Sequence, residues 1–268
     1  MSSSLKNILS ELKRLDDSNA SSVYVPSTNS TTLYKPLTMQ NQKLIIKAAL
    51  DPTSTNIDYN ISINKILSQL TSSPDDILVS DKPAVLLALR VANVGDVIKV
   101  EETDEEDEAH TVEVDLAKFI ATYDTITSQL DVVYKKRVVY DNITVKIRVP
   151  TLDIDTRFLK ECKLHVKRAT LPENIGGNIG EMYMYEVAKF IDSIQYSTIA
   201  PETSAKVVNT VLFGSTDVKD CVSIVEMLPM TVNKQIIEFI TAIRTVESKY
   251  ATVDGVIVPL DASLFALD

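Results

Sequence analysis

The sequence is poor in the residues on which most enzyme active sites depend. Its 268 residues include two histidines and two cysteines. His110 and His165 leave little scope for general acid–base catalysis near neutral pH. Cys162 and Cys221 are far apart, so neither a disulfide framework nor a paired-cysteine zinc site follows from them, and two buried thiols are the favoured interpretation. We therefore expect a protein that is not an enzyme, with no catalytic residues, no metal and no other cofactor.

Long apolar runs and an excess of positive charge are also missing. No run reaches the roughly 18 residues that cross a bilayer, and the N-terminal MSSSLKNILSELKRL lacks the apolar core and cleavage site of a signal peptide. We therefore expect no stable membrane insertion and assembly in a cytoplasm. The net charge is −10, whereas a nucleic-acid binder needs a basic face to replace the counterions on phosphates. We expect no nucleic-acid partner.

Acidic residues concentrate in one short segment. Residues 101–108, EETDEEDE, hold seven of the 37 acidic side chains, and without them 30 acidic residues face 27 basic ones. The flanking runs VIKV and HTVEVDL alternate as strands do, which predicts a hairpin with an acidic tip. An EF-hand calcium loop needs a glycine at its sixth position, and this run has none. A solvated tip is favoured, and an electrostatic contact with a basic partner is the alternative. The acidic residues concerned are Glu101, Glu102, Asp104, Glu105, Glu106, Asp107 and Glu108.

The N-terminal segment has the pattern of an amphipathic helix. Its hydrophobic side chains recur at three- and four-residue spacing, with one more on the flank. They are Leu5, Ile8, Leu12 and Leu15, with Leu9 beside them. Two heptads are too few to be stable alone, so we expect this helix either to pack on its own domain or to dock on a partner helix. Asp16–Ser22 is predicted to be a linker, so that residues 1–22 form a separate segment.

Residues 23–150 are predicted to form an α+β domain of hairpins and short helices. The run SVYVPSTNSTTLYKPLT predicts a hairpin, and Thr38 is placed to cap the next helix. The inward face of that helix is predicted to be Leu44, Ile45, Ala48 and Ala49. A break is expected over Asp51–Asn56. A second helix over residues 61–70 is predicted to turn Ile63, Ile66, Leu67 and Leu70 inward. A third begins after Ser80 or Asp81, with Pro83 in its first turn, and stops at Gly95. The runs KKRVVY and ITVKIRV around Asp141-Asn142 predict a second hairpin.

Residues 151–268 are predicted to be mainly helical. Helices are expected over residues 181–196, 204–213, 217–228 and 231–250, before a strand-like end, VDGVIVPLDASLF. The glycines in PENIGGNIGE are free to cradle a phosphate, but a turn is the favoured interpretation. Tyr183, Tyr185, Phe190 and Tyr196 are expected to pack in a core or an interface rather than stack on bases. Cys162 and His165 have a spacing that two metal ligands can use on a helix, whereas an extended segment would separate them.

Several phrases of the sequence resemble the baseplate hub subunit family of contractile-tailed, T-even-like bacteriophages. Leu33–Thr38 is similar to the end of the family's first hairpin, Leu89–Gly95 to the end of a helix, and Val112–Leu116 to a strand that follows a cysteine-containing knuckle. Here the acid run stands where family members often have those cysteines. The C-terminal YATVDGVIVPLDASLF resembles a second such knuckle, also without cysteines. The resemblance therefore implies a degenerate ribbon-like hairpin and carries over no zinc ligand.

The resemblance implies a structural, non-enzymatic protein of the virion, built into the central hub of the tail baseplate or required for its assembly. Its expected partners are other hub subunits and the tape-measure protein, and several copies are expected in a symmetric assembly. One alternative is a transient tail-assembly chaperone for the tape-measure protein, and another is an enzyme with an unrecognised site. Under the structural interpretation, the seam formed by Leu5, Ile8, Leu12 and Leu15 docks into a neighbouring subunit.

Overall fold

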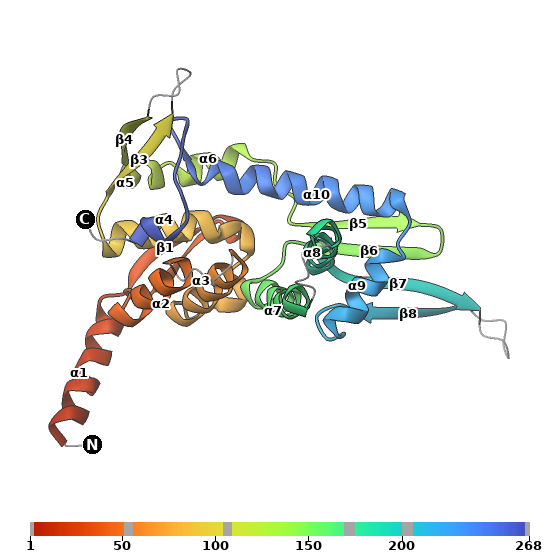
Figure 1. Ribbon diagram of the computed structural model, residues 1–268, viewed down its shortest axis with the longest axis horizontal. Coiled ribbons are helices and arrows are strands. Elements are labelled where there is room, and N and C mark those ends of the chain that lie inside the picture. The colour runs from red at the N-terminus through yellow and green to blue at the C-terminus, as the bar shows by residue number, and fades with distance from the viewer. Residues whose placement is uncertain (1–2, 51–55, 104–108, 169–174, 200–205, 266–268) are drawn as a thin grey trace. The chain divides into compact units, whose positions relative to one another are not determined.

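The computed structural model describes residues 3–50, 56–103, 109–168, 175–199 and 206–265 (Figure 1). Helices and small antiparallel sheets follow one another along the chain, so the protein is α+β, as expected. The chain divides into two compact units. Unit 1 comprises Met1–Ile77, Asp81–Leu130 and Glu247–Asp268, and unit 2 comprises Leu78–Ser80 and Asp131–Val246. These bounds differ from the segments 1–22, 23–150 and 151–268 proposed from the sequence.

Unit 1 combines short helices with two-stranded hairpins. Its helices are α1 (Ser3–Ser18), α2 (Met39–Leu50), α3 (Asn56–Leu70), α4 (Lys82–Asn93), α5 (Leu116–Ile120) and α6 (Tyr123–Gln129). Its strands pair as β1 (Ser21–Val25) with β2 (Ser30–Tyr34), β3 (Val97–Thr103) with β4 (Ala109–Asp115), and β9 (Thr252–Val253) with β10 (Val256–Ile257). The predicted N-terminal helix, the first hairpin, the three helices that follow it and the hairpin around the acid run are therefore confirmed.

The predicted linker is wrong. α1 continues through Ser18, whose hydroxyl donates to the carbonyl of Leu15 at 2.9 Å, and β1 begins at Ser21. The predicted inward face of α2 is only partly correct, because Ile45 is buried while Leu44 is 39% exposed. The face of α3 is correct in full, and all four of its predicted residues are buried. The predicted break over Asp51–Asn56 lies mostly outside the described residues, and α3 already begins at Asn56.

Polar side chains fix the ends of the helices in unit 1. The hydroxyl of Thr38 accepts from the backbone N–H of Asn41 at 3.2 Å, and the Asn41 amide oxygen accepts from the Thr38 N–H at 3.0 Å. Thr38 therefore caps α2, as the sequence predicts, and Asn41 makes the cap reciprocal. At the end of α4, the buried guanidinium of Arg90 donates to the carbonyls of Gly95 (3.0 Å) and Val97 (3.2 Å). Gly95 has φ +150°, which suits a residue without a side chain.

The C-terminal residues belong to unit 1 through hydrogen bonds that span most of the chain. The hydroxyl of Tyr123 donates to the carbonyl of Tyr250 at 3.2 Å, and that of Tyr59 donates to the carbonyl of Leu260 at 2.8 Å. The side-chain amide of Gln42 donates to the carbonyl of Phe265 at 2.8 Å. Because these partners lie 127 to 223 residues apart, no local pattern in the sequence predicts this closure.

Unit 2 is built on one antiparallel sheet of order β5-β6-β7-β8 (Figure 1). Its strands are β5 (Lys135–Tyr140), β6 (Ile143–Arg148), β7 (Ile191–Ile199) and β8 (Lys206–Leu212). Its helices are α7 (Leu152–Arg168), α8 (Ile175–Lys189), α9 (Val218–Glu226) and α10 (Met230–Lys249), the last as far as Val246. The hairpin around Asp141-Asn142 is confirmed, with Asp141 in the left-handed region (φ 50°), and so are α9 and α10.

One predicted helix is correct only in its first half, and another is a strand. Residues 181–196 split into the end of α8 and the start of β7, and residues 204–213 contribute β8. In β7, Ile191 and Ile194 are buried against the core while Ile199 is 73% exposed, so the apolar spacing imitates a helix although the segment pairs with β6 and β8. The glycine-rich segment is not a turn either, because Gly176, Gly177 and Gly180 lie within α8. α7 was not predicted at all.

Candidate interaction surfaces

The N-terminal helix exposes much of its predicted hydrophobic seam. Ile8, Leu12 and Leu15 are 57%, 52% and 41% exposed. The side chains of Leu5 and Leu9 lie outside the described part of the chain. On another face of α1, Glu11 and Arg14 form an exposed i,i+3 ion pair at 2.6 Å. The three described seam residues therefore do not form part of the core of unit 1, and the seam is available to a partner.

The acidic hairpin is a regular two-stranded ladder as far as it is described. β3 and β4 pair from Val97↔Asp115 to Thr103↔Ala109, and Ile98, Val100 and Val114 are buried on one face. Glu101 and Glu102 therefore belong to β3 itself. Glu102 lies 3.9 Å from His110, its cross-strand partner. The remaining residues of the predicted electrostatic loop, from Asp104 through Glu108, lie outside the described residues.

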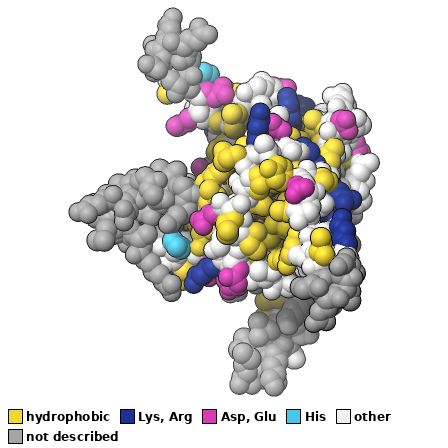
Figure 2. Space-filling model, turned by 90° about the vertical axis from the view of Figure 1, so that its right-hand side faces the viewer, with side chains coloured by type: hydrophobic (Ala, Val, Ile, Leu, Met, Phe, Trp, Pro, Cys, Tyr) yellow, Lys and Arg dark blue, Asp and Glu magenta, His cyan; other side chains and the backbone are white. Residues whose placement is uncertain are grey.

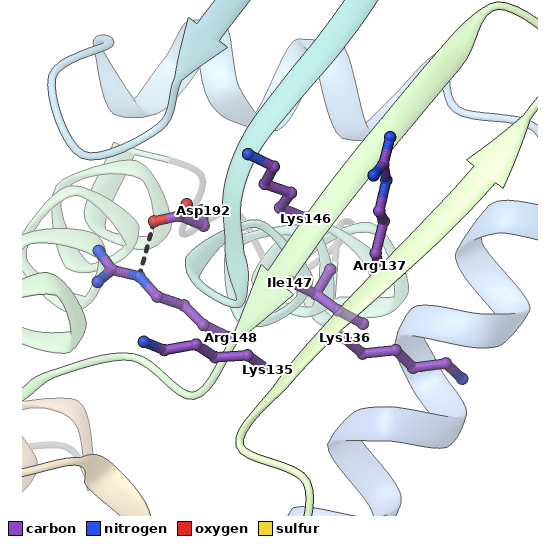
Figure 3. A pocket seen from close by; sticks show the side chains of 7 residues that line it. All are labelled: Lys135, Lys136, Arg137, Lys146, Ile147, Arg148 and Asp192. Carbon is purple, nitrogen blue, oxygen red and sulfur yellow. Dashed lines mark ion pairs between the residues drawn. The ribbon is translucent and has the colours of Figure 1, made fainter.

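Unit 2 carries a basic groove on β5 and β6 that the sequence analysis missed. A shallow pocket of about 340 Å³ is lined by Lys135, Lys136, Arg137, Lys146, Ile147, Arg148 and Asp192. The ladder places Lys135 opposite Arg148 and Arg137 opposite Lys146. Opposed residues of an antiparallel pair share a face, so these four cations lie on one face of the sheet. In Figure 3 the side chain of Lys136 extends away from those four.

A β-bulge places one carboxylate beside the basic groove. The register of β6 with β7 shifts between Lys146 and Ile147, whose partners are Ser193 and Ile191, so Asp192 is the additional residue. Bulges turn a side chain out of the regular alternation. Oδ1 of Asp192 forms an ion pair with Nε of Arg148 at 3.0 Å, shown as the dashed line in Figure 3. The basic groove thus has five cations and one carboxylate.

Unit 2 also exposes large hydrophobic side chains. Figure 2 shows hydrophobic side chains gathered on the face that it turns to the viewer. The exposed hydrophobic residues of β5, β7, β8, α10 and the turn before α10 are Val139, Tyr140, Tyr196, Ile199, Val207, Val208, Leu212, Met227, Met230 and Ile237. Val139 and Tyr140, like Val207 and Val208, are successive strand residues and point to opposite faces of the sheet, so the exposed apolar side chains of unit 2 are divided between two faces. Of the four predicted aromatic residues, Tyr185 and Phe190 are buried, while Tyr183 and Tyr196 are exposed.

Several titratable groups lie inside unit 2. Cys162 and His165 both lie on α7, and His165 Nδ1 is 3.4 Å from the hydroxyl of Tyr185. Burial raises the pKa of Cys162, and it raises that of Cys221 to about 11, which is the reverse of what an activated thiolate needs. Both thiols are free and buried, as the sequence analysis favoured. The buried Lys189 ammonium lies 2.7 Å from Asp155 and 2.5 Å from Glu186, forming an internal ion cluster.

A second cavity, of about 520 Å³, lies in unit 1 against β4, α5 and the β9–β10 hairpin. Its main polar groups are already paired. The Asp115 carboxylate caps α5 by accepting from the Lys118 N–H at 3.1 Å and pairs with the Lys118 ammonium at 2.8 Å. These hydrogen bonds lower the pKa of Asp115, so it is a poor base. Within the described residues, no three His, Cys, Asp or Glu side chains come together as a metal site, and no helix is long and apolar enough to cross a membrane.

The surface of the described residues thus has an exposed apolar seam on α1, an acidic hairpin and a basic groove. The chain belongs to the T4 bacteriophage base plate protein family, which matches it over residues 18–252. Membership makes it a structural component of a phage tail baseplate, where it contacts other baseplate proteins in an assembly of many copies. No curated protein and no solved structure matches the chain.

Proposed function

We propose that the protein is a non-enzymatic subunit of the central hub of the baseplate, where it contacts other hub subunits and the tape-measure protein. The family match supports the place in the baseplate, since it covers all of unit 2 and most of unit 1. The hub and the tape-measure protein are proposed from the resemblance of Leu33–Thr38, Leu89–Gly95 and Val112–Leu116 to hub subunits. Two raised thiol pKa values and the paired carboxylate in the cavity of unit 1 support a role without catalysis. Assembly takes place in the host cytoplasm before the particle is complete.

The seam of α1 is the proposed contact with a neighbouring subunit. α1 ends at Ser18, where the family match begins, so removing residues 1–17 leaves the matched region intact. Burying a leucine or isoleucine side chain contributes about 1.5–3 kcal/mol. Substituting Ile8 and Leu12 by Asp should therefore reduce incorporation into particles more than tenfold, in line with the roughly 3 kcal/mol or more lost from the contact.

A matched control keeps the charge change and moves it to another face. Asn7 and Ser10 are exposed and lie away from the seam, so the double substitution Asn7→Asp and Ser10→Asp should leave incorporation unchanged. Circular dichroism should show the helix content of the wild type for both double variants, and a folded chain that lacks only the contribution of α1 when residues 1–17 are removed. Equal incorporation of the seam variant and its control would refute the proposed contact, as would an unfolded truncation.

Mass spectrometry of purified, salt-washed particles separates the hub subunit from its main alternative. Peptides at a level comparable to that of known hub proteins would establish a subunit of the finished hub. Absence from particles, with the protein abundant in infected cells, would instead identify a transient chaperone of the tape-measure protein. Crosslinking within the particle should yield peptides joined to hub subunits and to the end of the tape-measure protein.

A further inference from the structure

The basic groove contains an unbalanced charge that the fold does not require. Lys135 opposes Arg148 and Arg137 opposes Lys146, and like charges directly across a ladder destabilise it. Arg148 pairs with Asp192, whereas no described side chain forms an ion pair with Lys135, Arg137 or Lys146. Three cations are therefore held together on one face without a counterion among the described residues.

We propose that the basic groove of one copy binds the acid run, Glu101–Glu108, of a second copy of this chain. The acid run has seven carboxylates in eight residues, and the groove has three cations without a described ion pair. The two units also differ in charge, since unit 1 is acidic and unit 2 is nearly neutral. Unit 1 holds 12 basic and 23 acidic residues, whereas unit 2 holds 15 and 14. Each chain therefore offers both halves of a complementary contact.

The cations of the basic groove are close enough together to be reached by one short acidic segment. Alternate residues of a strand lie about 6.6 Å apart on one face, and Lys135 and Arg137 are alternate residues of β5. Glu101 and Glu102 lie at the end of β3 next to the closing pair Thr103↔Ala109, and five further carboxylates follow in residues 104–108, so this end of the hairpin offers concentrated negative charge to the cations along β5. β5 is an edge strand of the sheet, so a neighbouring chain can approach it from the side.

A second copy is the occupant that the baseplate context favours. The family assembles in many copies, which keeps neighbouring chains at high local concentration. The contact is heterologous, since the groove of one copy meets the acid run of the next, and such contacts close into rings when the rotation allows it. This inference rests on the family and on the groove, and it holds whether or not the particular site is the hub.

Sedimentation of two complementary variants of the full chain tests the contact. The run variant replaces the seven carboxylates of residues 101–108 by their amides. The groove variant carries Lys135→Gln, Arg137→Gln and Lys146→Gln. At about 0.1 M salt the Debye length is about 10 Å, so local patches rather than the net charge decide association. We expect the wild type to self-associate and each variant alone to be monomeric, with self-association weakened at least tenfold.

Mixing the two variants distinguishes a contact between copies from a contact within one chain. The mixture retains one intact acid run and one intact groove, so we expect a two-chain complex that dissociates at about 0.5 M salt. The control Lys160→Gln, Lys206→Gln and Lys234→Gln removes the same charge from exposed positions of unit 2 and should associate like the wild type.

Four results would overturn the proposal. They are a wild type that stays monomeric, a groove variant that associates like the wild type, a mixture that stays monomeric, and aggregation of the groove variant. The last result would show that the lysines only protect an edge strand from pairing. Binding of a fluorescent single-stranded oligonucleotide by the wild type but not by the groove variant, without a complex in the mixture, would assign the groove to nucleic acid instead.

Discussion

The ion cluster within unit 2 allows the most demanding test of the structure. Lys189 and Asp155 are 8% and 2% exposed at their side chains and lie 2.7 Å apart, while Glu186 is 28% exposed and also pairs with Arg244. Removing Lys189 deprives the buried Asp155 carboxylate of this ammonium. Breaking a buried pair from one side costs about 3–5 kcal/mol. Replacing both partners by apolar residues is often neutral or stabilising, by about 1–4 kcal/mol.

A double-mutant cycle in urea measures both predictions. Lys189→Met should lower the free energy of unfolding by about 3–5 kcal/mol, whereas Lys189→Met with Asp155→Leu should recover most of that loss. The exposed Lys160→Met is the control and should change the free energy by less than about 0.5 kcal/mol. A loss below about 1 kcal/mol for Lys189→Met, or a double variant as unstable as the single one, would refute the assignment of a desolvated pair.

The same cluster has a defined pH dependence. Burial alone lowers the pKa of Lys189, but the carboxylates of Asp155 and Glu186 outweigh it, and the pKa lies above its ordinary 10.5. A cation whose pKa is raised on folding stabilises the protein below its unfolded pKa and loses that contribution as the pH rises through the folded value. The stability difference between wild type and Lys189→Met should therefore persist to about pH 10.5 and shrink above it.

Three further predictions follow from burial and capping. Cys162 and Cys221 should react with a thiol reagent at pH 8 on the order of a hundredfold faster in urea than in the native protein, as followed by absorbance, because burial raises both pKa values. Burial also raises the pKa of Tyr123, so stability should fall above about pH 10, where the unfolded phenol ionises, and Tyr123→Phe should reduce the slope of that fall by about 1.4 kcal/mol per pH unit. Thr38→Ala should cost about 1 kcal/mol in thermal or urea unfolding, since Asn41 loses its hydroxyl acceptor, and an unchanged midpoint would argue against the cap.

The surfaces of this protein differ in how they depend on conditions. The α1 seam is apolar, so its contact should resist salt, whereas the pairing of basic groove and acid run should weaken as salt rises. In an assembly that uses both contacts, the ionic strength would decide whether the groove contact forms in addition to the α1 contact. Particles prepared in high salt would then keep α1 contacts and lose those that rest on the groove.

Local chemistry accounts for the elements that were predicted correctly. Thr38 and Asn41 are three residues apart and cap the start of α2. The β-rich runs around Asp141 need only a two-residue turn to pair. The seam of α1 and the face of α3 repeat at the helical period within one element. In each case the interacting groups are near neighbours in the chain, so the pattern of residues is enough to define the structure.

The basic groove could be predicted from the sequence only in part. Lys135, Arg137, Lys146 and Arg148 stand at equal distances on either side of the turn at Asp141-Asn142, so the hairpin register alone places them opposite one another. These four basic residues could therefore have been placed on one face from the sequence, but the net charge of −10 directed attention away from a basic surface. The position of Asp192 beside the groove could not be predicted in this way, because Asp192 lies at a bulge in a strand more than 40 residues further along the chain.

By itself, the sequence determined the α+β class, the amphipathic N-terminal helix, both long hairpins and the resemblance to baseplate proteins. Tertiary structure alone decided that residues 191–199 and 206–212 are strands, because pairing with β6 satisfies their backbone and outweighs an apolar spacing that also fits a helix. It also decided that the chain's end returns to unit 1, through bonds such as that from Gln42 to Phe265. Contacts between residues so far apart depend on the packing of the whole fold, and no local pattern contains them.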